Sequence, residues 1–371
     1  MNYNFETRTP EMIALLRKLV ESESPSHDKP AVDRLGALLA EECQNTRAQI
    51  EVIPNSFTGN HLVARWGSGP GGILLMHHMD TVFPLNTLKN MPFVERDNKI
   101  HGPGVLDMKG GIVISLTAIR ALLDAGELSR PVTVLITSDE EIGSETSREL
   151  IERLAKQAAL VLVMESGLLD GSLKTWRKGV GDFLVKVKGR AAHAGGAHSE
   201  GRNAIEEIAH QVLAIQKMTN YETGTTLNVG VIKGGTVSNV VPEDASVEVD
   251  FRVLVPEEAE RVTRAMQALR PFTPDTILEV SGGLNRPPMP YDDLMKATFE
   301  KASKIAKGIG QPINAGGSGG GSDGNFVAPL GIPLLDGMGT YGEGLHSDRE
   351  YILTRSLPER AALTAALIKE W

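Results

Sequence analysis

The sequence predicts an α/β domain that is built from both ends of the chain and interrupted by a smaller α+β domain. Residues 132–137 and 160–164 are largely apolar, which is typical of strands buried on both faces of a sheet. Between residues 183 and 280 the strands alternate apolar and polar residues, which indicates a sheet with one exposed face. From Pro287 the α/β pattern returns. We therefore assign residues 1–176 and 287–371 to the first domain and residues 177–286 to the inserted one.

The first part of the chain predicts two helices, then strands and a further helix. Thr9 and Pro10 are typical of a helix start, because a hydroxyl can cap the first turn and proline fits there without its missing amide hydrogen. A second helix is expected from Lys29, where apolar residues recur at helical spacing. Apolar strands are expected at residues 50–53, 62–66 and 73–76, and a buried helix at residues 112–123.

The inserted segment shows the order strand, helix, strand, strand, helix, strand. These elements are expected at residues 183–187, 205–215, 226–232 and 245–253, from Pro256, and at residues 277–280. This order is that of the split βαβ, or ferredoxin-like, sandwich. Beyond it we expect a helix at residues 291–306, a glycine-rich loop, a strand at residues 332–335 and a last helix from Ser356.

Charge and cysteine content restrict the expected partners and compartment. Lys and Arg total 38 against 47 Asp and Glu, and the formal net charge is −9. Nucleic acids and anionic membranes attract basic surfaces, so we expect neither as a partner. The sequence has no run of 18 apolar residues, and its first residues lack the basic and apolar segments of a secretory signal. The single cysteine, Cys43, cannot form an internal disulfide, and we expect a cytoplasmic protein.

Two polar motifs border predicted elements before residue 112. His78 and Asp80 follow the strand at residues 73–76, and residues two apart in an extended chain share a face. Such a pair suits a metal-binding imidazole and its orienting carboxylate, although polar residues that simply close a strand give the same pattern. Asp107 lies in a glycine-rich turn, where it could bridge two cations or cap the next helix. The spacing of Gly and Lys in this turn does not match a Walker phosphate loop.

Three further motifs carry acids or an imidazole. Asp139, Glu140 and Glu141 begin two residues after the strand at residues 132–137, and adjacent acids repel each other unless a cation or proton compensates them. Glu165 follows the strand at residues 160–164, and His346 lies in a late loop. Alone, the acidic run fits a solvated loop equally well, and a lone loop histidine is more often solvated than a ligand. Together, most of these motifs lie at strand ends, where open α/β sheets bind ligands, and the donor set suits zinc.

The combined motifs resemble those of the M20 family of dinuclear-zinc exopeptidases and amidohydrolases. The likeness covers essentially the whole chain and is greatest to the carboxypeptidase G2 (glutamate carboxypeptidase) branch, in the segments at residues 78–82, 102–111 and 139–144. The resemblance implies an α/β/α catalytic domain of the zinc-exopeptidase (phosphorylase/hydrolase-like) fold with an inserted lid and dimerisation domain. It also implies a homodimer and two zinc ions per subunit, for which Co²⁺ or Mn²⁺ could substitute.

The resemblance gives each motif of the catalytic domain a role. One zinc would take His78 and Glu165 as ligands. The second would take Glu141 and His346, and Asp107 would bridge the two ions. Asp80 would orient His78, and Glu140 would be the general base and proton shuttle. The peptide bond between Asp107 and Met108 would be cis.

The resemblance also assigns residues beyond the metal ligands. His193 would polarise the scissile carbonyl in the site of the partner subunit. Positions that bind substrate are matched by Asn239, Arg252, Arg286, Gly321 and Ser322. The guanidinium groups suit a carboxylate, and so do the backbone amides of the glycine-rich loop, although the composition of that loop alone is that of a flexible linker.

These assignments predict a metallo-exopeptidase that hydrolyses the amide bond to a C-terminal amino acid, with Glu or Asp as the expected released residue. The substrate would be a small acyl-amino acid or peptide. The alternative is an N-acyl-amino-acid deacylase, similar to aminoacylases or acetylornithine deacetylase, and position 172 is Ser where some glutamate carboxypeptidases carry Lys. A non-catalytic binder on the same fold would be expected to lack a ligand or Glu140, and all are present. An aminopeptidase is less favoured, because the basic residues suit a carboxylate rather than an amine.

Overall fold

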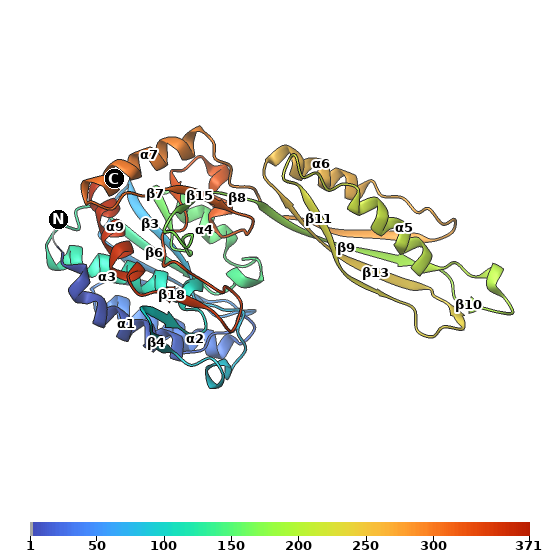
Figure 1. Cartoon of the computed structure of the whole chain (residues 1–371), viewed down its shortest axis with the longest axis horizontal. Coiled ribbons are helices and arrows are strands. Elements are labelled where there is room, and N and C mark those ends of the chain that lie inside the picture. The colour runs from blue at the N-terminus through green and yellow to red at the C-terminus, as the bar shows by residue number, and fades with distance from the viewer. Residues whose placement is uncertain (1–2) are drawn as a thin grey trace. The chain divides into compact units, whose positions relative to one another are not determined.

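The computed structural model describes residues 3–371, which form two compact units. Unit 1 contains the described residues up to Trp176, together with Tyr291–Ser318 and Ser322–Trp371. Unit 2 contains Arg177–Pro290 and the short stretch Gly319–Gly321. In Figure 1, the blue start and the red end of the chain both belong to unit 1. The domain boundaries inferred from the sequence stay a prediction, and we describe each unit by itself.

Unit 1 is built around a six-stranded sheet in the order β1-β2-β6-β3-β7-β16 (Figure 1). Its strands are β1 (Gln49–Ile53), β2 (His61–Trp66), β3 (Gly72–His78), β6 (Val132–Thr137), β7 (Ala158–Val163) and β16 (Leu334–Leu335). β2 is antiparallel to both of its neighbours, whereas β6, β3, β7 and β16 run parallel. Because β3 lies between β6 and β7, the carboxyl ends of three parallel strands meet at one edge of the sheet.

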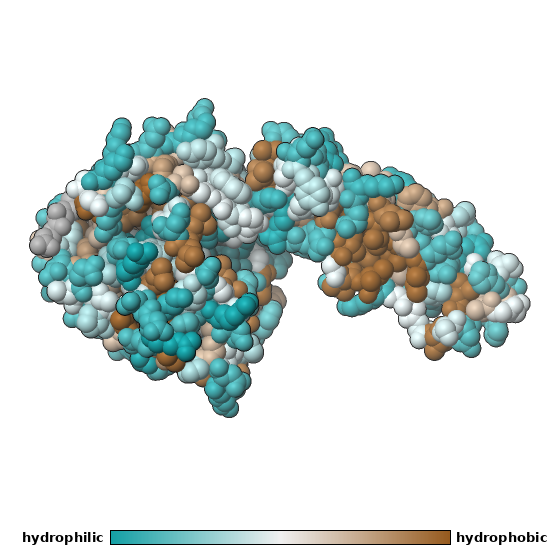
Figure 2. All heavy atoms as spheres, in the orientation of Figure 1, coloured by the Kyte–Doolittle hydropathy of each residue, from teal (hydrophilic) through white to brown (hydrophobic). Residues whose placement is uncertain are grey.

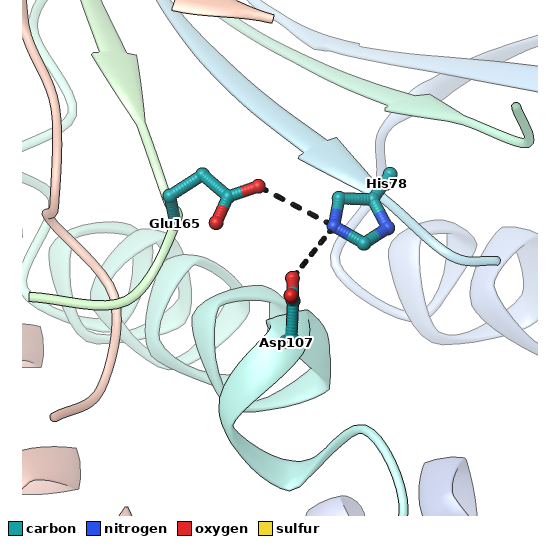
Figure 3. A group of neighbouring side chains, drawn as sticks. All are labelled: His78, Asp107 and Glu165. Carbon is teal, nitrogen blue, oxygen red and sulfur yellow. Dashed lines mark hydrogen bonds and ion pairs between the residues drawn. The ribbon is translucent and has the colours of Figure 1, made fainter. Parts of the chain in front are cut away.

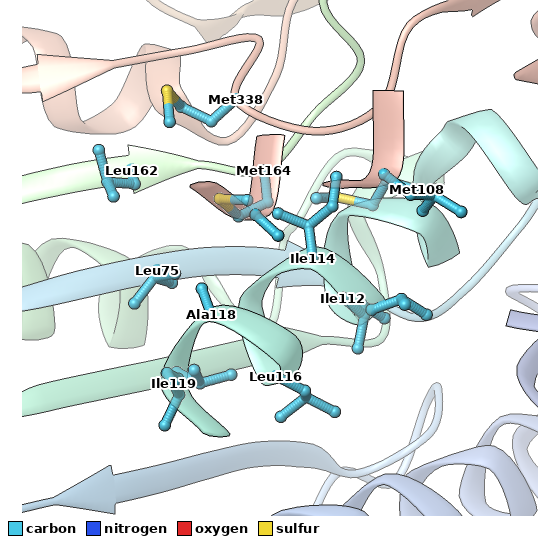
Figure 4. Close-up of a cluster of buried hydrophobic side chains, with 14 of the residues drawn as sticks. Leu75, Met108, Ile112, Ile114, Leu116, Ala118, Ile119, Leu162, Met164 and Met338 are labelled. Carbon is cyan, nitrogen blue, oxygen red and sulfur yellow. The ribbon is translucent and has the colours of Figure 1, made fainter. Parts of the chain in front are cut away.

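The central strands are buried on both faces, as their apolar sequences predicted. The residues of β3 from Ile73 to Met76 are each at most 2 % exposed. One face packs under α1 (Phe5–Glu21), α2 (Lys29–Gln44), α3 (Gly110–Asp124), α7 (Asp293–Gly308) and α9 (Ser356–Glu370). Figure 4 shows apolar side chains of α3 close to Leu75 and Met164 on this side. On the other face, α4 (Arg148–Ala155) contacts β7 and also α8 (Gly324–Val327).

The first two helices differ in how well their starts follow local signals. α2 begins after Asp28, whose carboxylate accepts a hydrogen bond from the amide of Ala31 at 2.9 Å. The helix predicted from Thr9 instead begins four residues earlier, at Phe5, and Pro10 lies inside it. The prediction of that start was wrong because Phe5 is buried in the core, and this packing extends the helix beyond its local start signal.

Short strands complete unit 1. β4 (Val94–Arg96), β5 (Lys99–His101), β17 (Gly342–Glu343) and β18 (Tyr351–Leu353) form an antiparallel sheet in the order β17-β18-β5-β4. β15 (Ala315–Ser318) pairs with β8 (Leu173–Arg177). None of these short strands was predicted.

Unit 2 is a four-stranded antiparallel sheet with two helices packed on one face. The strands β9 (Gly179–Lys188), β11 (Thr226–Gly234), β13 (Asp244–Val253) and β14 (Ile277–Arg286) lie in the order β11-β13-β9-β14. Alternate residues of β9, including Phe183 and Val185, form a core with α5 (Ala204–Gln216) and α6 (Pro256–Gln267). A separate pair, β10 (Ala192–His193) and β12 (Val240–Val241), projects from the loops. The chain order of the main elements is the predicted split βαβ order.

Within residues 3–371, no helix has both the length and the apolar character needed to span a bilayer.

We predict opposite effects for two Gly→Ala substitutions in helices of unit 1. A methyl group at Gly111, in the first turn of α3, would lie 2.1 Å from the carbonyl oxygen of Met164, so Gly111→Ala should destabilise the protein by about 1–3 kcal/mol. Gly36, inside α2, has room, because its added methyl group would meet only Met79 at 3.5 Å or more. Gly36→Ala should therefore stabilise by about 0.5–1 kcal/mol. Urea denaturation of both variants measures the two values, and an equal effect of the two substitutions would contradict this account.

Candidate metal centre

Polar side chains gather where the three parallel strands end. His78 is the last residue of β3, and Glu165 comes two residues after the end of β7. Glu140 and Glu141 lie in the short helix η3 (Glu140–Ile142), just beyond β6. Two further elements reach this edge: Asp107 lies in η2 (Val105–Lys109), directly before α3, and its peptide bond to Met108 is cis. His346 lies in the turn between β17 and β18.

The first group contains His78, Asp107 and Glu165, which Figure 3 shows converging from three elements. The Nε2 atom of His78 lies 3.0 Å from Oδ1 of Asp107 and 3.4 Å from Oε1 of Glu165. His78 is 1 % exposed, so its imidazole is shielded from solvent.

The second group contains Asp107, Glu141 and His346. The Nε2 atom of His346 lies 3.1 Å from Oδ2 of Asp107 and 3.2 Å from Oε2 of Glu141. Asp107 therefore belongs to both groups and presents a different oxygen to each. The imidazole of His346 is half exposed, so this group lies on the solvent side of the first.

The donor set fits divalent metal ions. Within each group, one donor atom from each residue lies within 4.8 Å of the others. Donors around a tetrahedral zinc with bonds of ~2.0 Å lie ~3.3 Å apart, close to the measured 3.0–3.4 Å separations of nitrogen and oxygen. The Oε1 atom of Glu141 is buried without a hydrogen-bond partner, and a cation would compensate it. Imidazole and carboxylate donors together are a zinc-type set.

The imidazoles and carboxyl groups of the two groups shift each other's pKa values. Burial alone would lower the pKa of His78, but its hydrogen bonds to Asp107, Asp80 and Glu165 outweigh burial and raise it well above the usual value. Hydrogen bonds to Asp107 and Glu141 raise the pKa of His346 to about 11. Burial opposes ionisation of Asp107, but His346 and His78 hold its pKa well below the usual range. Burial raises the pKa of Glu141. Near pH 7, His78 and His346 are therefore protonated, and their positive charges compensate the neighbouring carboxylates.

Asp80 connects His78 to the helix η3. The Nδ1 atom of His78 lies 3.0 Å from the backbone oxygen of Asp80 and 3.5 Å from its carboxylate, which fixes the ring and leaves Nε2 facing the site. The same carboxylate accepts a hydrogen bond from the hydroxyl of Ser26 at 2.7 Å and from the amides of Glu140 and Glu141 at 3.3 Å. One fully buried acid thus positions a candidate ligand and the two adjacent glutamates.

A polar network under η3 was missed by the sequence analysis. His61, in β2, lies 3.1 Å from Oγ of Ser138 through Nδ1 and 3.1 Å from Oγ1 of Thr146 through Nε2. Asp139 accepts hydrogen bonds from the amide and hydroxyl of Thr146, so this third acid of the run supports the loop. Burial lowers the pKa of His61, which keeps the ring neutral. The only sequence signal was a histidine directly before the strand predicted at residues 62–66.

The predicted carbonyl-polarising residue lies in unit 2, beside one predicted substrate-binding residue. His193 is exposed, and its Nδ1 atom accepts hydrogen bonds from the amides of Gly195 at 3.1 Å and Gly196 at 3.0 Å. These bonds leave the ring proton on Nε2, so the free edge of the imidazole is a donor. Asn239 is adjacent, because its carbonyl accepts a hydrogen bond from the amide of Ala194 at 3.0 Å.

The two predicted substrate-binding arginines lie across one strand of the unit 2 sheet. Val180 of β9 is paired with Arg252 of β13 on one side and with Arg286 of β14 on the other, so both arginines share a face. Arg252 forms an ion pair with Asp250 at 2.7 Å and stays about one-third exposed, whereas Arg286 is buried. A side chain at Gly321 would collide with Arg286 at 2.9 Å, so the glycine-rich loop passes directly over that arginine.

Ser322 belongs to unit 1 and is fully buried. Its hydroxyl donates to Asp336 at 2.6 Å, so the structure gives this side chain a support role in the loop. The binding roles inferred for Ser322 and for the residues of unit 2 stay predictions.

Comparison with known proteins identifies the family. The profile of peptidase family M20/M25/M40 matches residues 74–370. The chain belongs to this family. Carboxypeptidase G2 from Pseudomonas sp. strain RS-16 is 30 % identical over 370 residues, which span 97 % of this chain and 89 % of that protein. Acetylornithine deacetylase from Salmonella arizonae is 32 % identical over 268 residues, or 66 % of this chain and 68 % of that protein.

A solved structure with the same fold is that of the aminopeptidase PepT from Bacillus cereus. It has a TM-score of 0.78, 23 % identity and 98 % coverage of both chains, a likeness that shows the fold alone. Together these findings confirm the predicted family and fold class and the prediction of a hydrolase. M20 enzymes are metal-dependent metallopeptidases and amidohydrolases, and the two groups around Asp107 are a possible metal-binding cluster of this one.

We predict that metal uptake releases protons. The pKa values of His78 and His346 are raised in the metal-free protein, to about 11 for His346, so both rings are protonated near pH 7 and must lose a proton to bind metal. Metal affinity should therefore rise as the pH rises through the neutral range towards the pKa of His346. Calorimetric titration with Zn²⁺ in buffers of different ionisation enthalpy counts the protons, and His346→Ala should release fewer. A binding enthalpy that does not depend on the buffer would show that the rings are already neutral.

Proposed function

We propose that the protein is a two-metal exopeptidase that hydrolyses the amide bond between an acyl or peptidyl group and a C-terminal amino acid, with Glu or Asp as the released residue. The observation that carries this proposal is the position of Asp107, whose two oxygens face two separate groups of metal-type ligands. We assign His78 and Glu165 to one ion, Glu141 and His346 to the other, and zinc to both positions. Co²⁺ and Mn²⁺ are plausible substitutes on donor chemistry.

Two side chains are assigned to the proton transfer and to the carbonyl oxygen of the substrate. Bound metal ions would polarise the scissile carbonyl and lower the pKa of the attacking water. Glu140 precedes the candidate ligand Glu141, and its amide is held by Asp80 at 3.3 Å. We assign it as the general base that takes a proton from the water and returns it to the leaving amine. His193 is assigned to the carbonyl oxygen, because its Nε2 carries a proton and faces away from its amide contacts.

The arginines of unit 2 support the proposal that the leaving group carries a carboxylate. Arg252 and Arg286 share one face of the unit 2 sheet, and Arg177 lies in the same unit with its guanidinium 3.2 Å from the carbonyls of Gly320 and Gly321. A planar guanidinium can bind a carboxylate through two parallel hydrogen bonds. We therefore assign Arg252, Arg286, Asn239 and the backbone of the loop at Gly321 and Ser322 to the substrate.

The surface of unit 2 supports a homodimer. β11 is an edge strand of its sheet and packs against α5. Exposed apolar residues lie on both elements, with Leu213 63 % and Ile232 60 % exposed. Figure 2 shows apolar residues gathered on this part of the molecule. An unpaired strand edge beside an apolar surface suits a second copy of the chain.

We also propose a cytoplasmic location, since the only cysteine of the sequence, Cys43, is a buried free thiol.

The alternative is an N-acyl-amino-acid deacylase. The similarity to acetylornithine deacetylase favours it, and so does Ser172, which is buried and carries no charge. The two activities share the metal chemistry and differ in which part of the substrate is recognised. In the deacylase the acyl group would be small and fixed, whereas in the proposed exopeptidase it would vary.

We predict a clear preference for acidic leaving groups. With zinc-loaded protein, N-benzoyl-glutamate should be cleaved with a kcat/KM at least about tenfold above that of N-benzoyl-lysine and N-acetylornithine, because charged hydrogen bonds contribute about 1.5–3 kcal/mol. Arg252→Ala should raise KM for the glutamate substrate by about tenfold or more on the same reasoning. Arg270→Ala is the matched control in unit 2, since its side chain bonds only backbone carbonyls. Faster cleavage of N-acetylornithine than of N-benzoyl-glutamate would instead identify the deacylase.

We predict that two inactive variants complement each other. Glu140→Ala should keep its metal and lose most turnover, because the general base is gone, and His193→Ala should lose turnover through the carbonyl contact. If His193 acts in the site of the partner subunit, a mixed dimer of the two variants holds one intact site. Mixing them should then restore up to about one quarter of the wild-type rate, because half of the dimers are mixed and each has one working site of two. Metal content by elemental analysis is the control, and near-wild-type turnover by Glu140→Ala would refute the assignment of the base.

A further inference from the structure

Glu350 is a buried carboxylate that contacts the backbone of the bridging residue. It is fully buried, lies four residues after His346 and directly precedes β18. Its Oε1 atom accepts hydrogen bonds from the amide of Leu106 at 2.8 Å and from the amide of Asp107 at 3.2 Å. Neither the sequence motifs nor the assignments above give this residue a role.

The turn η2 depends on such an external acceptor. The first amides of a helical turn have no partner inside the turn, and Gly104, which precedes η2, has no side chain to cap them. Asp107 and Met108 also have non-helical backbone angles, so regular hydrogen bonding does not fix this turn. Glu350 supplies the missing acceptor from a segment more than 240 residues away in sequence. At the end of the turn, the Nζ atom of Lys109 donates hydrogen bonds to the carbonyls of Leu19 and Ser22, each at 3.0 Å.

The segment that carries Glu350 also carries His346. The amide of Ser347 donates to the carbonyl of Gly344 at 3.0 Å, and the amide of Glu350 donates to the carbonyl of Ser347 at 3.2 Å, so this stretch is a compact turn. It continues into β18, where Ile352 pairs with Ile100 of β5. One carboxylate therefore joins the turn that carries His346 to the turn that carries Asp107.

The two candidate metal positions differ in how they are supported. His78 and Glu165 are positioned by the ends of β3 and β7, which are paired with each other in the central sheet. His346 lies in the turn between β17 and β18, and its relation to Asp107 is set by the pairing of β18 with β5 and by the contacts of Glu350 with η2. We propose that Glu350 is a positioning residue that fixes Asp107 relative to His346 and so sets the spacing of the two metal ions. This inference rests on the proposed two-metal function.

Metal binding by variants of Glu350 tests this role. Glu350→Ala removes the acceptor, whereas Glu350→Gln keeps an amide oxygen that can accept both hydrogen bonds. Tyr351→Phe is the matched control on the next residue, because it removes only an exposed hydrogen bond to Glu343. Each metal-free protein is titrated with Co²⁺, followed by calorimetry and by the visible absorption of the bound ion. Thermal unfolding of the metal-free proteins reports on folding, and kcat and KM are measured on the same samples.

We expect Glu350→Ala to weaken the second Co²⁺ by at least about tenfold, to alter its absorption and to lower kcat by a similar factor, with KM within about threefold of wild type, as found for residues that orient metal ligands. The first Co²⁺ should bind as in wild type. Glu350→Gln and Tyr351→Phe should match wild type in all readouts. Wild-type metal affinity in Glu350→Gln would show that the site needs the hydrogen-bond acceptor at this position and does not need a negative charge there.

Unchanged affinity for both ions in Glu350→Ala would overturn the inference, and so would a loss in Glu350→Gln as large as that in Glu350→Ala. If Glu350→Ala does not fold, Glu350→Asp takes its place, since it keeps the carboxyl group but shortens the reach to the two amides. A Glu350→Asp protein with wild-type affinity for the second ion would also overturn the inference. Wild-type protein that binds two ions but cleaves no acyl-amino acid would refute the proposed function alone, because the affinity comparison still decides the role of Glu350.

Discussion

The carboxylate of Asp107 is the constraint on which the rest of the site depends. Its oxygens lie 3.0 Å from one imidazole and 3.1 Å from another, so five side chains from separate segments, Asp107 among them, must converge at one place. The parallel strands β3, β6 and β7 bring three of these segments to one edge of the sheet. The remaining two are turns, one before α3 and one between the paired strands β17 and β18, and the buried carboxyl group of Glu350 connects them.

Adjacent residues of the same chemical type have different contacts and different pKa values, because their surroundings differ. His77 and His78 are adjacent and both buried, yet they lie on opposite faces of β3. Burial lowers the pKa of His77 to about 3, and the ring contacts Ser115 at 2.8 Å inside the core. His78 meets three carboxylates and has a raised pKa. The acidic run divides in the same way, because Asp139 binds the amide of Thr146 while Glu141 faces His346.

The sequence predicted those parts of the site that follow strongly apolar strands. Glu165 and the pair of glutamates after β6 could be placed because buried strands have a clear pattern and end where polar residues begin. His346 could not be placed from its surroundings, since β17 and β18 are only two and three residues long. Only the family resemblance selected it. Glu350 and His61 escaped notice because their partners lie far away in sequence, and no local pattern encodes such contacts.

The order of the candidate metal ligands along the chain has a consequence for biosynthesis. His78, Asp107 and Glu165 all precede the inserted unit, whereas His346 follows it, close to α9. On the ribosome, the donors of the inner position therefore emerge well before the last donor of the outer one. In the proposed two-metal arrangement, a nascent chain would hold at most one of the two ions until its final segment is released. The proposed cleavage activity would therefore begin only when translation is nearly finished.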